Sequence, residues 1–348
     1  MIHEYLIVGS GFSSNVFKSL LKKKYKIIAP KLIDKEFYKN KKNHNFTHNK
    51  LLSKKTISVT RRKYYLPKNI YLYDHLLNGG SSNIWGGAIN LEKLKNKKIF
   101  ELLKINLIKL SFDKTFSISN KKNIYQMRDK KDQIYNFCHP GNDYINGFVI
   151  NFKLLKNHIN CEYFSFSKKK ILKIKCKKLF LATGVVQLIE ILANSGYIRN
   201  RSKLSLDEYE HFFKISFSNK IKSNKTIVKY NLIGSIKHYL GYQKKINNFF
   251  KIFSFIPMYI DQIFTNKKKK IEFTFKNNSF YLSSVKKFGD SAHYHNLKIN
   301  NIKINEFLKK ITRNKIQVIS MPAAVQTKPG PISNDILEIV LKNLKIKS

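Results

Sequence analysis

Apolar residues at the start of the chain follow two different periods. Residues 5–8 are a continuous apolar run, which is typical of a buried strand, and residues 26–29, Lys-Ile-Ile-Ala, predict a second strand. Between residues 15 and 24 the apolar positions recur every three or four residues, which predicts a helix. The pattern therefore predicts a strand, a turn, a helix and a second strand in succession.

A similar strand-to-helix step recurs in the middle of the chain. Residues 178–181 form an apolar strand, and residues 185–195 follow with helical spacing. Upstream of this step, alternating apolar and polar residues predict the short paired strands of a small meander, in three segments: 147–150, 161–164 and 170–174.

The second half of the chain is predicted to contain antiparallel strands. Aromatic and β-branched residues alternate with polar ones in residues 212–217 and 271–275, as in half-buried strands. Between them, residues 246–264 predict a helix, either buried or lying on a membrane surface. The end of the chain predicts a strand, a loop rich in proline and glycine, and an amphipathic helix, at residues 315–320, 321–331 and 334–344.

The charge of the chain is its most unusual property. A chain of 348 residues with 43% hydrophobic residues suggests a globular protein of two domains. The net charge is +46, and of 67 basic residues only six are arginines, which leaves 61 lysines. Because the lysines run through every segment, we interpret them as drift toward AT-rich codons. Binding of anionic lipid or of anionic substrates remains the alternative.

The sequence lacks two kinds of segment that would indicate a membrane or secreted location. No apolar run reaches the roughly 20 residues that a membrane-spanning helix needs, and no signal peptide precedes the first strand. The cysteines Cys138, Cys161 and Cys176 are odd in number and scattered, which indicates neither a disulfide framework nor a metal site. We therefore expect a cytoplasmic protein without a bound metal.

The turn after the first strand has the sequence Gly9-Ser10-Gly11-Phe12-Ser13-Ser14. Gly9 permits a tight turn, and Gly11 lets the backbone approach a phosphate group. The helix that follows offers free N–H groups and the positive end of its dipole to an anion. The turn therefore predicts a dinucleotide site, with a plain strand–turn–helix connection as the alternative.

Dinucleotide sites usually have an acidic residue about 20 residues after this motif, where it holds the ribose hydroxyls. Here the second strand ends in Ala29-Pro30-Lys31, and the nearest acid is Asp34. Either Asp34 reaches back to the ribose or that contact is missing.

A second glycine-rich stretch, residues 78–88, holds four of the fourteen glycines and the single tryptophan. Its small residues let the backbone approach a large planar or anionic ligand, and its serines and N–H groups offer donors. Trp85 either stacks near such a ligand or fills the core, and a simple turn is the alternative for the whole stretch. The candidate binding residues are Gly79, Gly80, Ser81, Ser82, Asn83, Trp85, Gly86 and Gly87.

The two glycine-rich stretches, in this order and spacing, resemble the glucose–methanol–choline (GMC) family of FAD-dependent oxidoreductases, most closely its bacterial members from polysaccharide gene clusters. The resemblance implies that the second stretch lies along the isoalloxazine ring and the pyrophosphate of FAD. It also implies that Ala182-Thr183-Gly184 keeps the backbone close to the adenosine half of the cofactor. The chain is short for this family, so its substrate domain is expected to be trimmed.

The implied fold class is α/β, with a Rossmann-like FAD-binding domain and a second domain of antiparallel β-sheet plus helix that caps the substrate site. The FAD-binding domain is expected to be discontinuous and to comprise residues 1–100, 148–200 and 286–348. Residues 101–147 and 201–285 are expected to form the cap.

Two histidines supply the candidate chemistry. His293 and His295 are spaced i, i+2, so on a strand they point to the same face. Hydride removal from an alcohol carbon also requires the hydroxyl proton to leave, and a histidine with a pKa near neutrality is a natural acceptor. The family has a histidine here, but Asn296 and Leu297 replace the Gly-Thr of its His-x-x-Gly-Thr-x-x-Met segment. Which histidine is equivalent stays open, as does a structural role for both.

The last part of the chain resembles the family's closing strand, flavin-contacting loop and final helix. Ser320 stands where the family has an aspartate that holds the ribityl or pyrophosphate region of FAD, so a second acid is missing. Gly330 in the loop and Ser333, at a helix N-terminus expected at Ser333-Asn334, are further candidates for contacting FAD.

The sequence therefore predicts an FAD-dependent oxidoreductase that oxidises a CH–OH group, with a sugar as one candidate substrate. Hydride would pass to flavin N5, and a histidine would act as general base. The expected partners are a small alcohol or sugar and an unidentified electron acceptor, without nucleic acid. Two alternatives are open: a degenerate FAD-fold protein without turnover, and a basic protein that binds nucleic acid or associates peripherally with a membrane.

Overall fold

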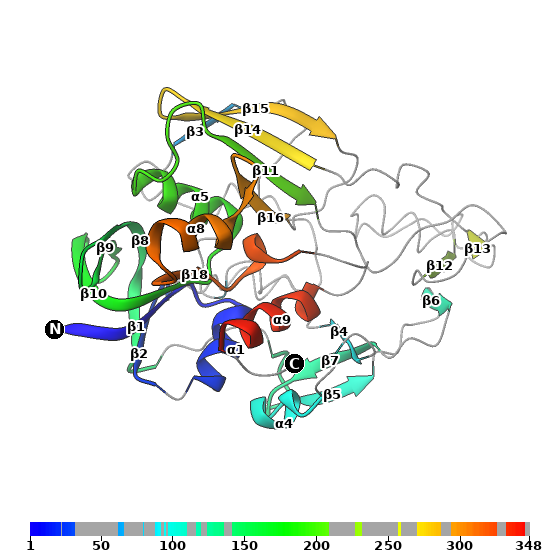
Figure 1. The fold of residues 1–348 in the computed structure, drawn as a ribbon. Helices are drawn as coiled ribbons and strands as arrows, with labels where there is room; N and C mark the ends of the chain where they lie inside the picture. The colour runs from blue at the N-terminus through cyan, green and yellow to red at the C-terminus, as the bar shows by residue number, and fades with distance from the viewer. Residues whose placement is uncertain are drawn as a thin grey trace.

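The computed structural model describes most of the segments in which the sequence predicts cofactor contacts (Figure 1). The described residues are 1–21, 23–31, 62–65, 79, 88–91, 94, 97–109, 116–119, 124–135, 141–208, 227–231, 257–258, 270–286, 294–325 and 332–344. Together they form a mixed α/β fold with several sheets.

Five parallel strands form the centre of the described structure. From one edge to the other their order is β8, β2, β1, β10 and β18. Numbered in chain order this is 3-2-1-4-5, the strand order of dinucleotide-binding Rossmann folds. The order reverses between β1 and β10, and ligands bind such folds at the carboxyl ends of the strands beside this reversal. The strands are β1 (Ile2–Val8), β2 (Tyr25–Ala29), β8 (Tyr144–Leu154), β10 (Lys170–Leu181) and β18 (Ile316–Val318).

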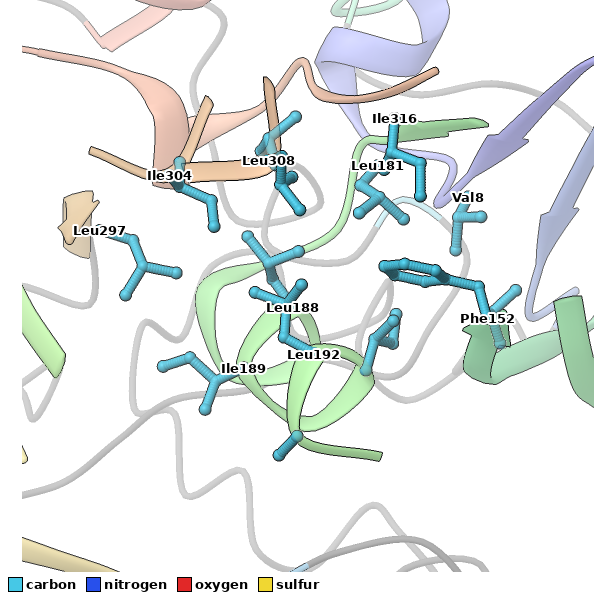
Figure 2. Close-up of a cluster of buried hydrophobic side chains, with 14 of the residues drawn as sticks. Val8, Phe152, Leu181, Leu188, Ile189, Leu192, Leu297, Ile304, Leu308 and Ile316 are labelled. Carbon is cyan, nitrogen blue, oxygen red and sulfur yellow. The ribbon is translucent and has the colours of Figure 1, made fainter. Parts of the chain in front are cut away.

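Helices cover both faces of the parallel sheet, because its central strands are apolar on both sides. Helices α1 and α9 share a buried cluster with Ile7 on one face. Helix α5 packs on the opposite face, where Leu188 lies in a cluster with Val8 and Leu181 (Figure 2). The helices are α1 (Phe12–Leu20), α5 (Val185–Asn194) and α9 (Ile332–Leu344).

The predicted strand–helix–strand unit and the predicted helix after β10 are both confirmed, with shifted ends. Helix α1 begins at Phe12, three residues before the expected start, and ends at Leu20. Helix α9 begins at Ile332, so Ser333 and Asn334 lie inside its first turn and not before it. These ends depend on cap and packing geometry, which apolar periodicity does not report.

The predicted meander is confirmed, but its strands are longer than expected. Strands β8, β9 (Ile159–Ser165) and β10 pair antiparallel in succession. Strand β10 runs without a break, so the strands expected at residues 170–174 and 178–181 are one element. Its first half pairs with β9 and its second half with β1, which joins the meander to the parallel sheet.

A second sheet lies on the far side of α5 and α8 from the parallel sheet (Figure 1). Its order is β17-β16-β11-β14-β15-β3, and every pair except β15–β3 is antiparallel. The strand predicted at residues 271–275 is confirmed as part of β14. The elements are β3 (Lys63–Tyr65), β11 (Lys203–Glu208), β14 (Lys270–Lys276), β15 (Ser279–Lys286), β16 (Tyr294–Ile299), β17 (Ile302–Lys303) and α8 (Ile304–Thr312).

Two three-stranded sheets complete the described structure, and one of them corrects a prediction. Residues 257–258, expected inside a helix at 246–264, form a strand paired with β12. Pro257 has no N–H to donate within a helix, so it opposes the helical pattern. The other residues of that helix, and the strand expected at 212–217, lie outside the described residues. The remaining elements are β13 (Pro257–Met258), β12 (Ile227–Asn231) and β6 (Phe116–Ser119), then β4 (Ala88–Asn90), β7 (Ile124–Arg128), β5 (Asn106–Lys109) and α4 (Ile99–Leu103). Among the described helices, none has both the length and the apolar character needed to span a membrane.

A buried ion pair connects α5 to the second sheet. The Arg62 Nη1 atom, just before β3, lies 3.1 Å from Glu190 Oε2 on α5, and the two side chains are 12% and 7% exposed. Arg62 also donates to Asn194 Oδ1 at 2.6 Å and to Asn278 Oδ1 at 2.8 Å. Burial raises the pKa of Glu190, while hydrogen bonds from Tyr64 and Arg62 act to lower that pKa. Arg62, next to β3, therefore joins α5 to the β14–β15 turn of the second sheet.

Candidate functional site

The glycine turn between β1 and α1 packs directly against the end of β10. Gly9 has a φ of +105°, and its N–H donates to Ile28 O at 2.9 Å. A Cβ atom at Gly9 would lie 2.6 Å from Ala182 O. The Ser14 hydroxyl donates to Gly9 O at 2.7 Å, so the serine in the third glycine position closes the turn. Only glycine fits the conformation and the space at position 9.

Two helices point their N-termini at the strand reversal. Helix α1 starts after Gly11 at the end of β1, and α5 starts after Gly184 at the end of β10. Within the described residues neither helix has a side-chain cap, and neither has an acidic residue in its first turn. Their first N–H groups and dipoles therefore suit an anion, and a pyrophosphate has the matching charge.

The second glycine-rich stretch is held against the first at one end. The Gly79 N–H donates to the Ser10 hydroxyl at 2.8 Å in a buried contact, and Gly79 has a φ of +83°. Two residues after the stretch, Asn90 on β4 bonds the buried Asn334 side chain of α9. The Asn90 N–H donates to Asn334 Oδ1 at 3.0 Å, and the Asn90 carbonyl accepts from Asn334 Nδ2 at 2.8 Å. The predicted residues of this stretch that lie outside the described ones are Gly80, Ser81, Ser82, Asn83, Trp85, Gly86 and Gly87.

Thr183 is the buried group that a ligand would satisfy. It is 3% exposed, and its Oγ1 has no hydrogen-bond partner in the described part of the chain. Its carbonyl accepts a bond from the Ser320 hydroxyl at 2.7 Å. Ser320 thus joins the ends of β10 and β18, while the hydroxyl of Thr183 stays available at the strand reversal.

The end of β2 carries a cation where dinucleotide sites usually carry an acid. Lys31 is exposed, its N–H donates to Asn146 Oδ1 at 2.8 Å, and its Nζ lies 5.9 Å from the centre of the Tyr144 ring. The Tyr144 hydroxyl donates to Pro30 O at 3.0 Å. Asp34, the alternative ribose ligand, lies outside the described residues.

His295 is buried next to the segment that follows β18. It is 4% exposed, and its Nδ1 lies 3.1 Å from Ala324 O. Because a carbonyl oxygen only accepts, this contact requires a proton on Nδ1. Ala324 follows the 3₁₀-helix η5 (Met321–Ala323), which itself follows Ser320. This short path brings His295 to the same edge as the glycine turn, whereas His293 and Gly330 lie outside the described residues.

A polar pair beside His295 has no signal in the sequence. Asn296 has a φ of +51°, and its Nδ2 donates to the buried Asp207 Oδ2 at 2.6 Å. The pairing of β16 with β11 is irregular at this point, between Ser205 and Asp207. Asn296 therefore lies at a bulge and bonds a carboxylate on the neighbouring strand.

No family model matches the chain, and no curated protein matches it. Several solved structures are distantly similar. A flavoprotein/dehydrogenase from Cytophaga hutchinsonii is 10% identical with a TM-score of 0.26, over 61% of this chain and 47% of that one. The myxobacterial chondrochloren halogenase CndH, a variant of FAD-dependent halogenases, is 10% identical with a TM-score of 0.34, over 99% and 73%. The glycerol-3-phosphate dehydrogenase of Bacillus halodurans, solved with FAD, is 9% identical with a TM-score of 0.30, over 100% and 66%.

These neighbours are flavoproteins of several kinds, and none of them is described as a GMC enzyme. The chain spans about half of the length of the Cytophaga protein. The strand order and the contacts around Gly9, Gly79 and Thr183 make this edge of the sheet the candidate dinucleotide site.

Proposed function

We propose that this protein binds FAD across the carboxyl ends of β1 and β10 and oxidises a CH–OH group of a small alcohol or sugar. The observation that carries the proposal is the bond from the Gly79 N–H to the Ser10 hydroxyl. It joins two glycine-rich stretches, 69 positions apart, at the strand reversal where Rossmann folds bind dinucleotides. Such a junction places Gly79 beside the turn at Gly9 to Ser14, which suits a cofactor with a pyrophosphate.

The residues present fit FAD at the pyrophosphate and leave its ribose less well held. The uncapped starts of α1 and α5 would hold the pyrophosphate, and the Thr183 hydroxyl would gain its missing partner. Lys31 offers no acceptor to the adenosine ribose. When bound, FAD would supply the hydride acceptor that no side chain can provide.

The protein's own contribution to the reaction would be made by His295. With Nδ1 bonded to the Ala324 carbonyl, Nε2 is the nitrogen that would take the hydroxyl proton of the substrate. The carbonyl fixes the tautomer and the ring orientation. The closed, buried surroundings of His295 would exclude water from the proton transfer. His293 stays a second candidate for the same role.

The visible absorption spectrum of the purified protein tests the cofactor assignment. We expect a flavin spectrum that denaturation releases as free FAD, near one equivalent per chain. A colourless protein that also fails to take up added FAD would overturn the proposal. Substrate screening on sugars and other alcohols, with flavin bleaching as the readout, follows only after flavin has been found.

Replacing Thr183 by valine should separate cofactor binding from stability. The change removes a buried hydroxyl without a partner, so the free energy of unfolding of the cofactor-free protein should stay equal or rise by about 1 kcal/mol. FAD affinity should fall roughly tenfold or more, since the hydroxyl would bond the cofactor. Titration with FAD and urea unfolding without FAD provide the two readouts. Unchanged FAD affinity would remove Thr183 from the site.

Replacing His295 by glutamine should reduce turnover at least a hundredfold, a loss typical of a missing general base, with FAD retained. His158, in the turn between β8 and β9, offers a matched histidine whose replacement by glutamine should leave turnover unchanged. The His293→Gln variant tests the second candidate. Full turnover of the His293→Gln/His295→Gln double variant, with FAD bound, would contradict the proposed mechanism.

One observation favours a second function, a degenerate flavin-fold protein without turnover. Lys31 stands where dinucleotide sites usually have an acid, and Ser320 stands where the resembled family has an aspartate and uses its hydroxyl to join two strands. This alternative predicts flavin binding without reduction by any alcohol or sugar. Wild-type protein whose bound flavin bleaches with a substrate would exclude it.

A further inference from the structure

We propose that the outward side of the β8–β9–β10 meander docks on an anionic lipid surface, independently of the cofactor site. Burial alternates along β9 and β10, so that Cys161, Ile174 and Cys176 face the core. The residues between them point outward. We call the exposed lysines Lys153, Lys173, Lys175 and Lys177 on this side, together with Ile171, the basic face.

Lysine is denser here than in the chain as a whole. Residues 168–178 include seven lysines in eleven positions, whereas the whole chain has 61 in 348. Composition alone does not assign a function to these lysines, because lysine runs also occur elsewhere, as at residues 22–24 and 267–270. The strand also places these side chains together, because every second residue from 171 to 177 projects to the same side of β10.

Two carboxylates lie on the strands beside these lysines. One is Glu4 on β1, which comes next to Lys177 in the β1–β10 register and pairs with Lys23 at 3.2 Å. The other, Glu162 on β9, accepts from Asn151 at 2.9 Å and lies 3.4 Å from the Lys173 Nζ atom. It offsets one positive charge, and within the described residues Lys153, Lys175 and Lys177 appear in no ion pair. The basic face therefore keeps a net positive charge.

Exposed aliphatic side chains flank the lysines. Ile171 is 52% exposed and Ile2 is 46% exposed, and Ile2 lies directly beside Lys175 in the β1–β10 register. The N-terminus and the three strands lie together at one edge of the molecule (Figure 1). Met1 is fully exposed next to them. The surface thus combines apolar side chains that can enter a lipid interface with cations that attract its headgroups.

This combination fits lipid better than nucleic acid. Proteins that bind single strands stack bases on exposed aromatic rings, and arginine is preferred for bidentate contacts to bases. The described part of the basic face offers aliphatic side chains and lysines, and Phe164 beside Ile171 is engaged with Phe148 and Phe166 in an aromatic cluster. The occupant we assign is a membrane surface that carries anionic headgroups.

Vesicle sedimentation with the full-length protein tests the assignment. We expect binding to phosphatidylcholine vesicles that contain phosphatidylglycerol and none to phosphatidylcholine alone. The triple variant Lys173→Glu/Lys175→Glu/Lys177→Glu should bind at least tenfold more weakly. The control Lys309→Glu/Lys310→Glu/Lys342→Glu changes the net charge equally on α8 and α9 and should bind like the wild type. Equal losses in both variants, or no binding by the wild type, would overturn the proposal.

A second pair of variants tests the apolar part. Ile171→Ser should weaken the vesicle binding that persists at high salt. Leu102→Ser, which alters a leucine on α4 that is 60% exposed, should not. If Ile171→Ser binds like the wild type while duplex DNA binds tightly to the basic face, the partner is nucleic acid and the lipid assignment is wrong. Circular dichroism of every variant confirms that the fold is kept.

Discussion

Replacing Gly9 by alanine is expected to lower the free energy of unfolding by roughly 3–5 kcal/mol and to abolish flavin retention. Two costs add at this position. A φ of +105° is strained for any residue with a Cβ, and that Cβ would lie 2.6 Å from Ala182 O. Neither side can move easily, because β1 and β10 are adjacent parallel strands in the centre of the sheet. Urea unfolding and the flavin content of the purified variant measure the two effects.

Three other glycines form a matched set of controls for the two costs. In Gly147→Ala the new Cβ would meet Phe164 O, but Gly147 has no positive φ. In Gly196→Ala the φ is +78° and no atom lies within 4 Å of the new Cβ. Gly141→Ala has neither cost and should stay within about 0.5 kcal/mol of the wild type. If Gly9→Ala unfolds like Gly141→Ala, the described turn is wrong.

Replacing Arg62 by methionine is expected to cost about 3–5 kcal/mol, because it leaves Glu190 buried without its cation. Asn194 and Asn278 would also lose a donor, and the second sheet would lose its polar link to α5. An exposed pair offers the control. Arg128 and Asp132 lie 3.0 Å apart with side chains 29% and 70% exposed, so Arg128→Met should cost about 1 kcal/mol or less.

The pH dependence of the Arg62→Met variant has a definite sign. Burial raises the pKa of Glu190 in the folded protein, and the bonds from Tyr64 and Arg62 limit that rise. A carboxyl group whose pKa is raised in the folded protein stabilises the folded state fully at pH values below the ordinary glutamate pKa. This stabilisation is lost as the pH rises through the raised pKa. Without Arg62 the pKa of Glu190 should rise further. The deficit of Arg62→Met, which is its loss in free energy of unfolding relative to the wild type, should therefore be smallest in acid and grow toward neutral pH.

Urea unfolding across this pH range measures the deficit, and the variant Arg62→Met/Glu190→Gln provides the internal test. With a neutral side chain at position 190, the growth of the deficit with pH should disappear. A deficit for Arg62→Met that stays constant with pH would show that the loss comes from packing and not from the stranded carboxylate.

The sequence predicted those parts of the fold that depend on neighbouring residues. The succession of β1, α1 and β2 could be read from apolar periods, and so could the step from β10 to α5, because both are local patterns with glycines at the turns. The helix predicted at residues 246–264 was wrong at Pro257–Met258. That prediction relied on the apolar content of the segment and did not take the proline into account.

The site was predictable only in its local elements. The turn at Gly9 shows in the sequence because its glycines are adjacent, whereas the contacts that assemble the site join distant residues. The Asn90–Asn334 bonds span 244 positions, and the Ser320–Thr183 bond spans 137. Nothing local marks which asparagine or serine will find which carbonyl, so these partners come only from the folded structure.

The placement of β1 has a consequence for how the chain is made. Strand β1 and helix α1 leave the ribosome before their neighbours β10 and α9, which come much later in the chain. Until residue 341 has emerged, Ile7 and Phe17 lack part of the apolar surface that buries them, since Leu337 and Leu341 belong to the same cluster. A nascent or C-terminally shortened chain therefore shows an unpaired apolar strand edge, the feature that chaperones hold and that aggregation exploits.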